Sequence, residues 1–139
     1  MISVGKINEQ LTWEIGGGTL TIRGNGEMQN NNFATFKDFF HTVVIESGVR
    51  SIKYHAFGHH KKLTSITIPN TVKSIEDRAF LCCDNLKSIT NFNNLPIKID
   101  SSVFAGVSQS KCILRVPTSY VPVYKNADVW KEFIIVGIR

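Results

Sequence analysis

The chain contains little cysteine and little proline, and it has no long apolar run. Its 139 residues include three cysteines, which form no obvious disulfide framework of the kind that holds many small secreted domains together. No segment approaches the roughly 18 to 20 consecutive apolar residues of a transmembrane helix, so we expect no membrane insertion. Residues 1–10 also lack the apolar core of a signal peptide. Either an export signal has been removed or the protein stays inside the cell, and we favour removal.

Recognisable catalytic and cofactor-binding motifs are also missing. Gly24 and Gly26 match half of a dinucleotide-binding fingerprint, but Gln29 stands where the third glycine belongs, and no βαβ unit surrounds them. No nucleophile-elbow sequence occurs. The acidic residues at turns or at a helix start are best interpreted as solvated structural groups: Glu46, Glu76 and Asp77. We therefore expect no enzyme, no catalytic residue and no cofactor.

A metal site is a weaker alternative that the cysteines and histidines raise. The adjacent pair Cys82 and Cys83 lacks the Cys-x₂-Cys spacing that zinc sites commonly use. The histidines that could join it are His55, His59 and His60. Cys83 shares its repeat position with His60 and Val107, which favours a small buried side chain over a metal ligand. We therefore predict no specific metal site.

Composition indicates one domain with a modest positive charge. A 42% hydrophobic content in 139 residues suits a single core. Sixteen basic and 11 acidic residues give a net charge of +5, which is compatible with nucleic acid, anionic glycans or acidic surfaces. The basic residues are spread along the chain without a recognition helix or an aromatic RNA-binding motif. We expect no nucleic-acid partner.

The most informative feature present is an internal repeat. Apolar residues in the segment 43–63 recur 23 positions later in the segment 66–86. A period of this length is typical of solenoids, in which each unit buries its apolar side only against its neighbours. The matched pairs are Val43 and Ile66, Val49 and Val72, Ile52 and Ile75, Phe57 and Phe80, and Leu63 and Leu86.

A third copy follows with one inserted residue. Ile89 keeps the spacing of 23, whereas Ile99 and Phe104 lie 24 positions after their counterparts, so the insertion falls within residues 91–96. Leu114 then begins a further strand, but no second Ala-Phe pair follows, and the array ends there.

Within one unit, local patterns indicate which segment forms which element. Residues 66–68 alternate like a short strand that Pro69 and Asn70 end. Residues 76–83 begin with acids, which suits the positive end of a short helix or 3₁₀ turn. Stacked copies should form two internal rows: Val43, Ile66, Ile89 and Leu114 in one, and Phe57, Phe80 and Phe104 in the other.

Both ends of the array are predicted to be capped, because a terminal repeat otherwise exposes apolar surface and an unpaired strand edge. Residues 11–15 and 19–22 alternate around three glycines and predict a β-hairpin. Residues 120–133 predict a short amphipathic helix over the last repeat, and residues 134–136 a final strand. The fold class is therefore α/β, a short solenoid of one domain over residues 1–139. Its parts are an N-terminal hairpin cap (1–42), about three repeats (43–116) and a C-terminal helical and strand cap (117–139).

These residues resemble a known family. The repeat LTSITIPNTVKSIEDRAFLCCDNL at residues 63–86 is similar to the BspA-like leucine-rich repeat of bacterial surface proteins. Trp13 and residues 18–28 are similar to that family's amino-terminal hairpin, and residues 116–133 to its carboxy-terminal cap. The resemblance implies a secreted or surface-displayed adhesion module that binds host matrix, host cells or other microbes, without cofactor or catalysis. It implies no specific binding residues.

Two surfaces could hold a ligand. Outward-facing residues of the stacked strands should align in a strip, which four strands would make about 15–20 Å wide. The strip comprises Thr42, Val44, Ser65, Thr67, Ser88, Thr90 and Arg115. The second is a basic turn at residues 53–62, where histidine would make anion binding pH-sensitive. Its candidate ligand-binding residues are His59, His60, Lys61 and Lys62. For each surface taken alone, we favour the alternative that it is ordinary solvated surface.

Three functions from different classes remain open. The favoured one is an extracellular or cell-surface recognition module, monomeric, that binds a protein or glycan on host or microbial surfaces. The second is a structural or capping fragment of a larger surface assembly with no ligand of its own. The third is an enzyme, which would need a pocket that this sequence does not indicate.

Overall fold

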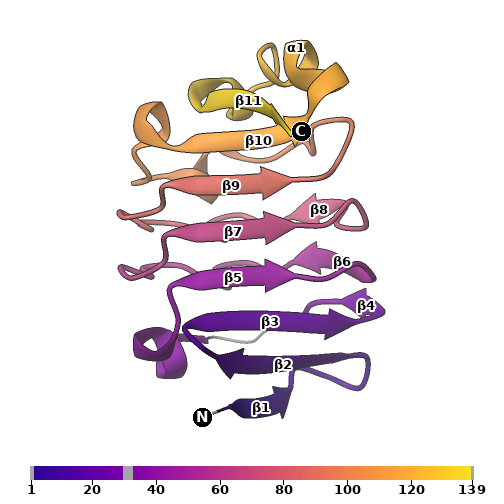
Figure 1. Ribbon diagram of the computed structural model, residues 1–139, viewed down its shortest axis with the longest axis vertical. Coiled ribbons are helices and arrows are strands. Elements are labelled where there is room, and N and C mark those ends of the chain that lie inside the picture. The colour runs from indigo at the N-terminus through magenta and orange to yellow at the C-terminus, as the bar shows by residue number, and fades with distance from the viewer. Residues whose placement is uncertain (1, 30–32, 139) are drawn as a thin grey trace.

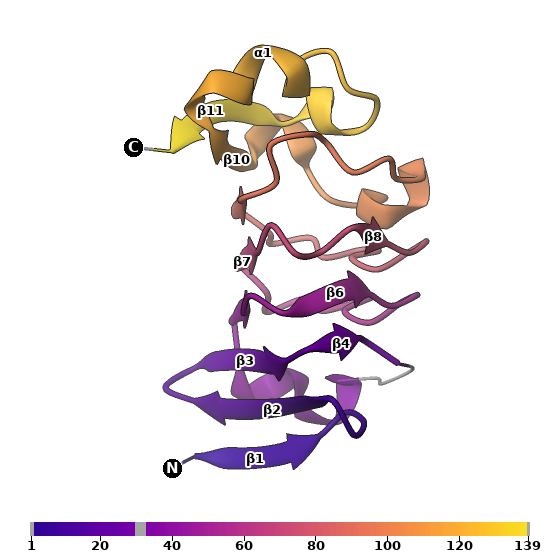
Figure 2. The same cartoon turned by 90° about the vertical axis from the view of Figure 1, so that its right-hand side faces the viewer.

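The computed structural model describes residues 2–29 and 33–138. Strands are stacked along one side of the molecule, and turns lie along the other side (Figure 1). Eight strands form one sheet in the order β1-β2-β3-β5-β7-β9-β10-β11. Their bounds are β1 Ser3–Lys6, β2 Leu11–Gly16, β3 Thr19–Gly24, β5 Thr42–Ile45, β7 Ser65–Ile68, β9 Ser88–Asn91, β10 Ile113–Pro117 and β11 Ile134–Ile138. A second sheet contains β4 (Gly26–Glu27), β6 (Val49–Ile52) and β8 (Ser74–Ile75), which lie apart from the first sheet in Figure 2.

The predicted repeat spacing is confirmed by the strand register. β5, β7 and β9 are parallel, with Val43 opposite Ile66 and Ile66 opposite Ile89. Leu114 continues this row on β10, and all four side chains are buried. The spacing also extends one unit upstream, because β3 pairs in parallel with β5 and sets Leu20 opposite Val43. One apolar row therefore runs through five strands.

A second row consists of stacked aromatic rings. Phe57, Phe80 and Phe104 lie nearly parallel at centroid distances of 5.5 Å, as predicted. Phe33 extends the row at one end, 5.3 Å from Phe57. Trp130 meets Phe104 edge-on at the other end, with centroids 5.5 Å apart. Both arrangements lie within the geometry that aromatic pairs favour, so this column joins successive repeats through specific contacts.

Of the two alternatives predicted for residues 76–83, the short helix does not form. Consecutive turns occupy residues 77–82, and the N–H of Ala79 donates to the carbonyl of Glu76 at 3.2 Å, three residues back. Arg78 (φ 60°) and Cys82 (φ 56°) have left-handed backbone conformations, which interrupt a right-handed helix. Other backbone groups of these turns pair across repeats. The N–H of Phe57, for example, donates to the carbonyl of Ala79 at 2.8 Å. Stacking therefore satisfies polar groups that a local helix would otherwise satisfy.

The predicted N-terminal hairpin is present as β2 and β3, with Ile15 opposite Leu20. β1 adds an antiparallel strand outside it. Gly24 is required where the hairpin meets the first turn. Its φ is +129°, and a Cβ there would lie 1.9 Å from the carbonyl oxygen of Gln10. The chain can leave β3 toward β4 on this path only without a side chain.

The C-terminal segment differs from its prediction. Residues 120–133 do not form one amphipathic helix. Instead, α1 (Val121–Tyr124) is followed by a separate 3₁₀ turn at Trp130–Glu132. Val129 has a φ of 70°, which prevents a continuous helix between them. The final strand β11 is present and lies parallel to β10.

No helix in residues 2–29 and 33–138 is both long and apolar enough to span a bilayer.

The insertion in the third repeat forms a loop that the C-terminal segment holds in place. The Tyr124 hydroxyl donates to the carbonyl of Asn93 at 2.9 Å, and the Trp130 indole N–H donates to the carbonyl of Ile97 at 2.7 Å. Inside the loop, the Asn91 side-chain oxygen accepts from the backbone and side-chain N–H groups of Asn93 at 3.0 and 2.9 Å. These bonds connect the last complete repeat to the end of the chain.

His60 lies inside the stack, contrary to its predicted role in an exposed basic turn. Only 2% of His60 is accessible, and its ring lies 4.5 Å from that of Phe40. It occupies the interior position that Cys83 and Val107 fill in the next repeats, and all three are buried, which was predicted for Cys83 and not for His60. Burial lowers the pKa of His60 to about 4, and the positive charge of Lys37 adds to this effect.

The aromatic column gives a testable stability effect. We expect Phe80→Ala to lower the free energy of unfolding by about 3–5 kcal/mol, because it removes a fully buried ring from the middle of the column. Phe39→Ala is the matched control, since that ring is 66% exposed, and it should change stability far less. Urea unfolding of both variants measures the difference. Equal losses would show that the column does not carry the stability we assign to it.

The burial of His60 in its neutral form predicts that the fold is less stable in acid. The folded state keeps the ring neutral, whereas the unfolded chain binds a proton below about pH 6.5, so stability falls as the pH drops from 6.5 toward 4. We expect a loss of about 2 kcal/mol between about pH 7 and pH 5. Urea unfolding at the two pH values measures it. His60→Val, which copies the residue type at Val107, should remove this part of the loss, and an unchanged pH dependence in that variant would contradict the assignment.

Candidate functional site

The outer face of the large sheet brings most of the predicted strip together. Ser65 lies opposite Ser88, and Thr67 lies opposite Thr90, on β7 and β9. Thr90 in turn lies opposite Arg115 on β10. The serines and threonines are half-buried and Arg115 is exposed, so two rows of side chains lie side by side on one face. We call this surface the hydroxyl strip.

The hydroxyl strip extends one strand farther than predicted. Thr19 and Thr21 on β3 lie opposite Thr42 and Val44 on β5 and extend both rows. At about 4.8 Å between strands, the five strands from β3 to β10 that carry the strip span roughly 19 Å, and the whole eight-stranded sheet spans roughly 34 Å. A surface of this width is adequate for a standard protein interface of about 800 Å² per partner.

Charges on this face are few and mostly paired. Arg23 lies between Glu14 at 3.3 Å and Glu46 at 3.1 Å, and the hydrogen bond with Glu14 and the charge of Glu46 raise the pKa of the guanidinium. Arg115 forms no ion pair within the part of the chain that the structure describes. Arg115 is therefore the cation on the hydroxyl strip that is available to a partner's carboxylate.

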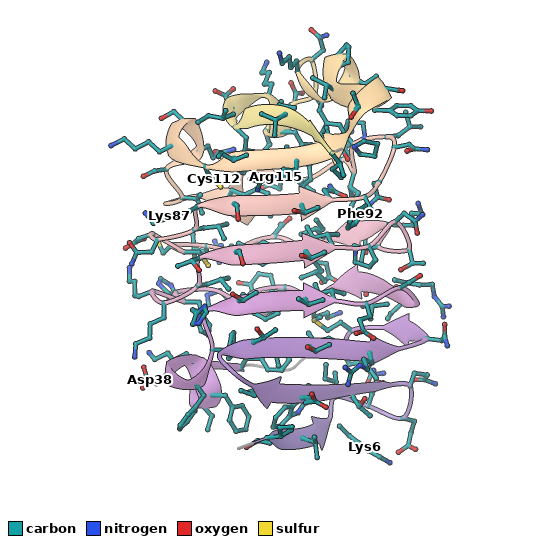
Figure 3. All side chains as sticks on the ribbon, viewed as in Figure 1. Lys6, Asp38, Lys87, Phe92, Cys112 and Arg115 are labelled. Carbon is teal, nitrogen blue, oxygen red and sulfur yellow. The ribbon has the colours of Figure 1, made fainter. Side chains whose placement is uncertain are left out.

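A groove that the sequence analysis missed lies at the edge of the strip. It has a volume of about 540 Å³. Its lining comprises Val44, Ile45, Glu46, Ser47, Thr67, Pro69, Asn70 and Phe92. Figure 3 shows Phe92 beyond the end of β9, and 43% of this residue is exposed. The one-residue insertion was a signal of irregularity here, but the repeat pattern alone could not show which side chains the loop would expose.

The basic turn is not a free cationic patch. Lys61 forms an ion pair with Asp84, and Lys62 with Asp38 at 3.4 Å. The hydrogen bond to Asp84 raises the pKa of Lys61. His59 is exposed, but His60 is buried and cannot contact a ligand on the surface. The structure thus separates His60 from the other three predicted residues and places an acidic side chain beside each lysine.

Two of the three cysteines, Cys83 and Cys112, are buried. Residues 2–29 and 33–138 contain no cluster of three or more His, Cys, Asp or Glu side chains able to hold a metal ion. The Cys83 thiol donates to the carbonyl of Phe57, with sulfur and oxygen 3.1 Å apart. Burial raises the pKa of Cys83 to about 12 and that of Cys112 to about 11, so both thiols stay protonated near neutral pH.

Comparisons with known proteins agree with this architecture. The crystal structure of a leucine-rich repeat protein from Eubacterium ventriosum is similar in fold, with a TM-score of 0.66 at 18% sequence identity. The match covers 100% of this chain and 40% of that chain, so the present chain spans less than half the length of its structural neighbour. No curated protein matches the sequence.

The match to a family model covers most of the chain. The family model described as the BspA type leucine rich repeat region (6 copies) matches residues 26–122, from β4 into α1. Since the match exceeds half of the sequence, and since the fold is a sheet-dominated leucine-rich repeat fold with little helix, this chain belongs to the BspA-type leucine-rich repeat family.

Proposed function

We propose that this chain is a non-catalytic recognition module that binds a protein or glycan on host or microbial surfaces through the hydroxyl strip. The observation that carries the proposal is the width of the face, with aligned hydroxyl rows, few unpaired charges and an adjoining groove. Hydroxyl groups can donate and accept hydrogen bonds and cost less to desolvate than charges. Modules of this family are often surface-associated and bind proteins, which supports an extracellular or cell-surface location.

We further propose that residues 1–139 act as one monomeric solenoid domain. The hairpin β2–β3, with β1 outside it, closes one end of the stack, and residues 117–139 close the other. Trp130 and Phe133 support the second assignment, because both are buried and meet Phe104 edge-on. Each end would thus cover apolar rows that the terminal repeats cannot cover themselves.

The second candidate function is a structural fragment of a larger surface protein. The observation that favours it is the exposed edge strand β11, where Ile134 and Val136 are accessible and could meet a neighbouring domain. The length of the structural neighbour is consistent with such an arrangement. This candidate predicts a folded chain that binds its own kind or an adjacent domain and no external ligand.

The first experiment tests the hydroxyl strip with a matched pair of substitutions. Ser65→Arg places a bulky charged side chain in the middle of the strip, and Ser74→Arg places the same side chain on β8 in the other sheet. Binding to immobilised matrix proteins, mucins and glycans is measured at low and physiological salt. We expect Ser65→Arg to weaken saturable, salt-resistant binding by about tenfold or more, as for a central interface residue, and Ser74→Arg to leave it unchanged.

Three outcomes would contradict this proposal. Equal effects of the two arginines would place the binding surface elsewhere. The absence of any saturable binding would favour the structural fragment, whereas binding that disappears at physiological salt would indicate non-specific charge attraction.

The basic turn is tested separately with Lys61→Ala combined with Lys62→Ala. Because both lysines are ion-paired, we expect this double variant to keep its affinity for the same panel, including sulfated glycans. Its affinity is measured beside that of Ser65→Arg in the same assay. A large loss in the double variant would make the turn, with His59, the binding surface in place of the hydroxyl strip.

A further inference from the structure

The insertion loop exposes apolar side chains although it is firmly anchored. Phe92 is 43% exposed and Leu95 67% exposed. On either side of Leu95, the chain is held by the hydrogen bonds from Tyr124 to Asn93 and from Trp130 to Ile97. Large apolar side chains held in place in this way can meet a partner at a small cost in conformational entropy.

A second groove adjoins the groove beside the hydroxyl strip, because Phe92 and Asn70 line both. It has a volume of about 500 Å³, and its lining includes Lys73 and the loop up to Lys98. We call the second one the loop groove.

The charge of the loop groove has one sign. Lys73 and Lys98 line it, and no acidic side chain does. Within residues 2–29 and 33–138, neither lysine forms an ion pair, and the Lys73 ammonium donates only to the amide oxygen of Asn93 at 3.1 Å. These cations differ from Lys61 and Lys62, whose charges have acidic partners.

From these observations we infer that the loop groove is a docking site for a protein segment that carries a large apolar side chain flanked by carboxylates. The apolar side chain would pack on Phe92 and Leu95, and the carboxylates would pair with Lys73 and Lys98. This inference rests on the proposed recognition function, and it names the partner chemistry at a site beside the hydroxyl strip. Charge complementarity of this kind orients a partner and raises its association rate.

The test uses a short synthetic peptide with a central Asp-Phe-Asp-Glu sequence, titrated at millimolar concentration into the ¹⁵N-labelled domain. We expect amide shifts to concentrate at Lys73, Leu95 and Lys98. Two further peptides, one with lysines in place of the acids and one with alanine in place of phenylalanine, should bind at least about tenfold more weakly.

Substitutions in the domain give the second half of the test. Phe92→Ser combined with Leu95→Ser should weaken peptide binding about tenfold or more. Lys73→Gln combined with Lys98→Gln should weaken it and remove its salt dependence. The matched controls are Val123→Ser, which is 40% exposed on α1, and Lys111→Gln combined with Lys125→Gln, both exposed and outside the groove. The controls should bind as the parent does, and thermal unfolding should show every variant folded.

The failures of the two proposals can be told apart. The proposal for the loop groove would be overturned if the peptide shifted amides only elsewhere or none at all. It would also be overturned if the lysine-bearing peptide bound equally well. The hydroxyl strip would still stand if matrix proteins or glycans bound in a way that Ser65→Arg weakened. Absence of binding in both assays would overturn both proposals.

Discussion

Stacking of units in a common register is the constraint on which the rest of this structure depends. A unit of about 23 residues is too small to enclose its own apolar side chains, so Ile66 is buried only because Val43 and Ile89 lie above and below it. The same register aligns the phenylalanine rings at 5.5 Å and pairs the backbone groups of the turns across repeats. Loss of register would disrupt apolar contacts, ring packing and backbone hydrogen bonds together.

The alignment of side chains on the outer face of the sheet follows from the register that stacks the inner side chains. In a strand, side chains alternate between the two faces, so a register that stacks isoleucines inside must also stack Ser65 on Ser88 and Thr67 on Thr90 outside. The two hydroxyl rows are thus a geometric consequence of the repeat. Where the repeat is irregular, at residues 91–96, the surface departs from the regular rows and exposes the ring of Phe92 and the side chain of Leu95.

The C-terminal segment shows how an irregular region becomes ordered. Asn93 and Ile97 of the third repeat lie outside the strands, and their carbonyls accept hydrogen bonds from the Tyr124 hydroxyl and the Trp130 indole. Both aromatic side chains are also fully buried. One segment therefore contributes to the core and positions the loop, so the shape of the loop depends on residues about 30 positions away in the sequence.

The sequence by itself determined the repeat length, both interior rows, the hairpin and the last strand, because these depend on periodicities of two and 23 residues that are visible along the chain. It also determined which residues of the strip share a face. Only the tertiary structure decided between a helix and turns at residues 76–83 and showed that residues 120–133 break at Val129, since Arg78, Cys82 and Val129 adopt left-handed conformations without being glycine. Only the tertiary structure could bury His60, pair Lys61 and Lys62 with acids from other units, and expose Phe92, because each of these depends on neighbours far away in the sequence.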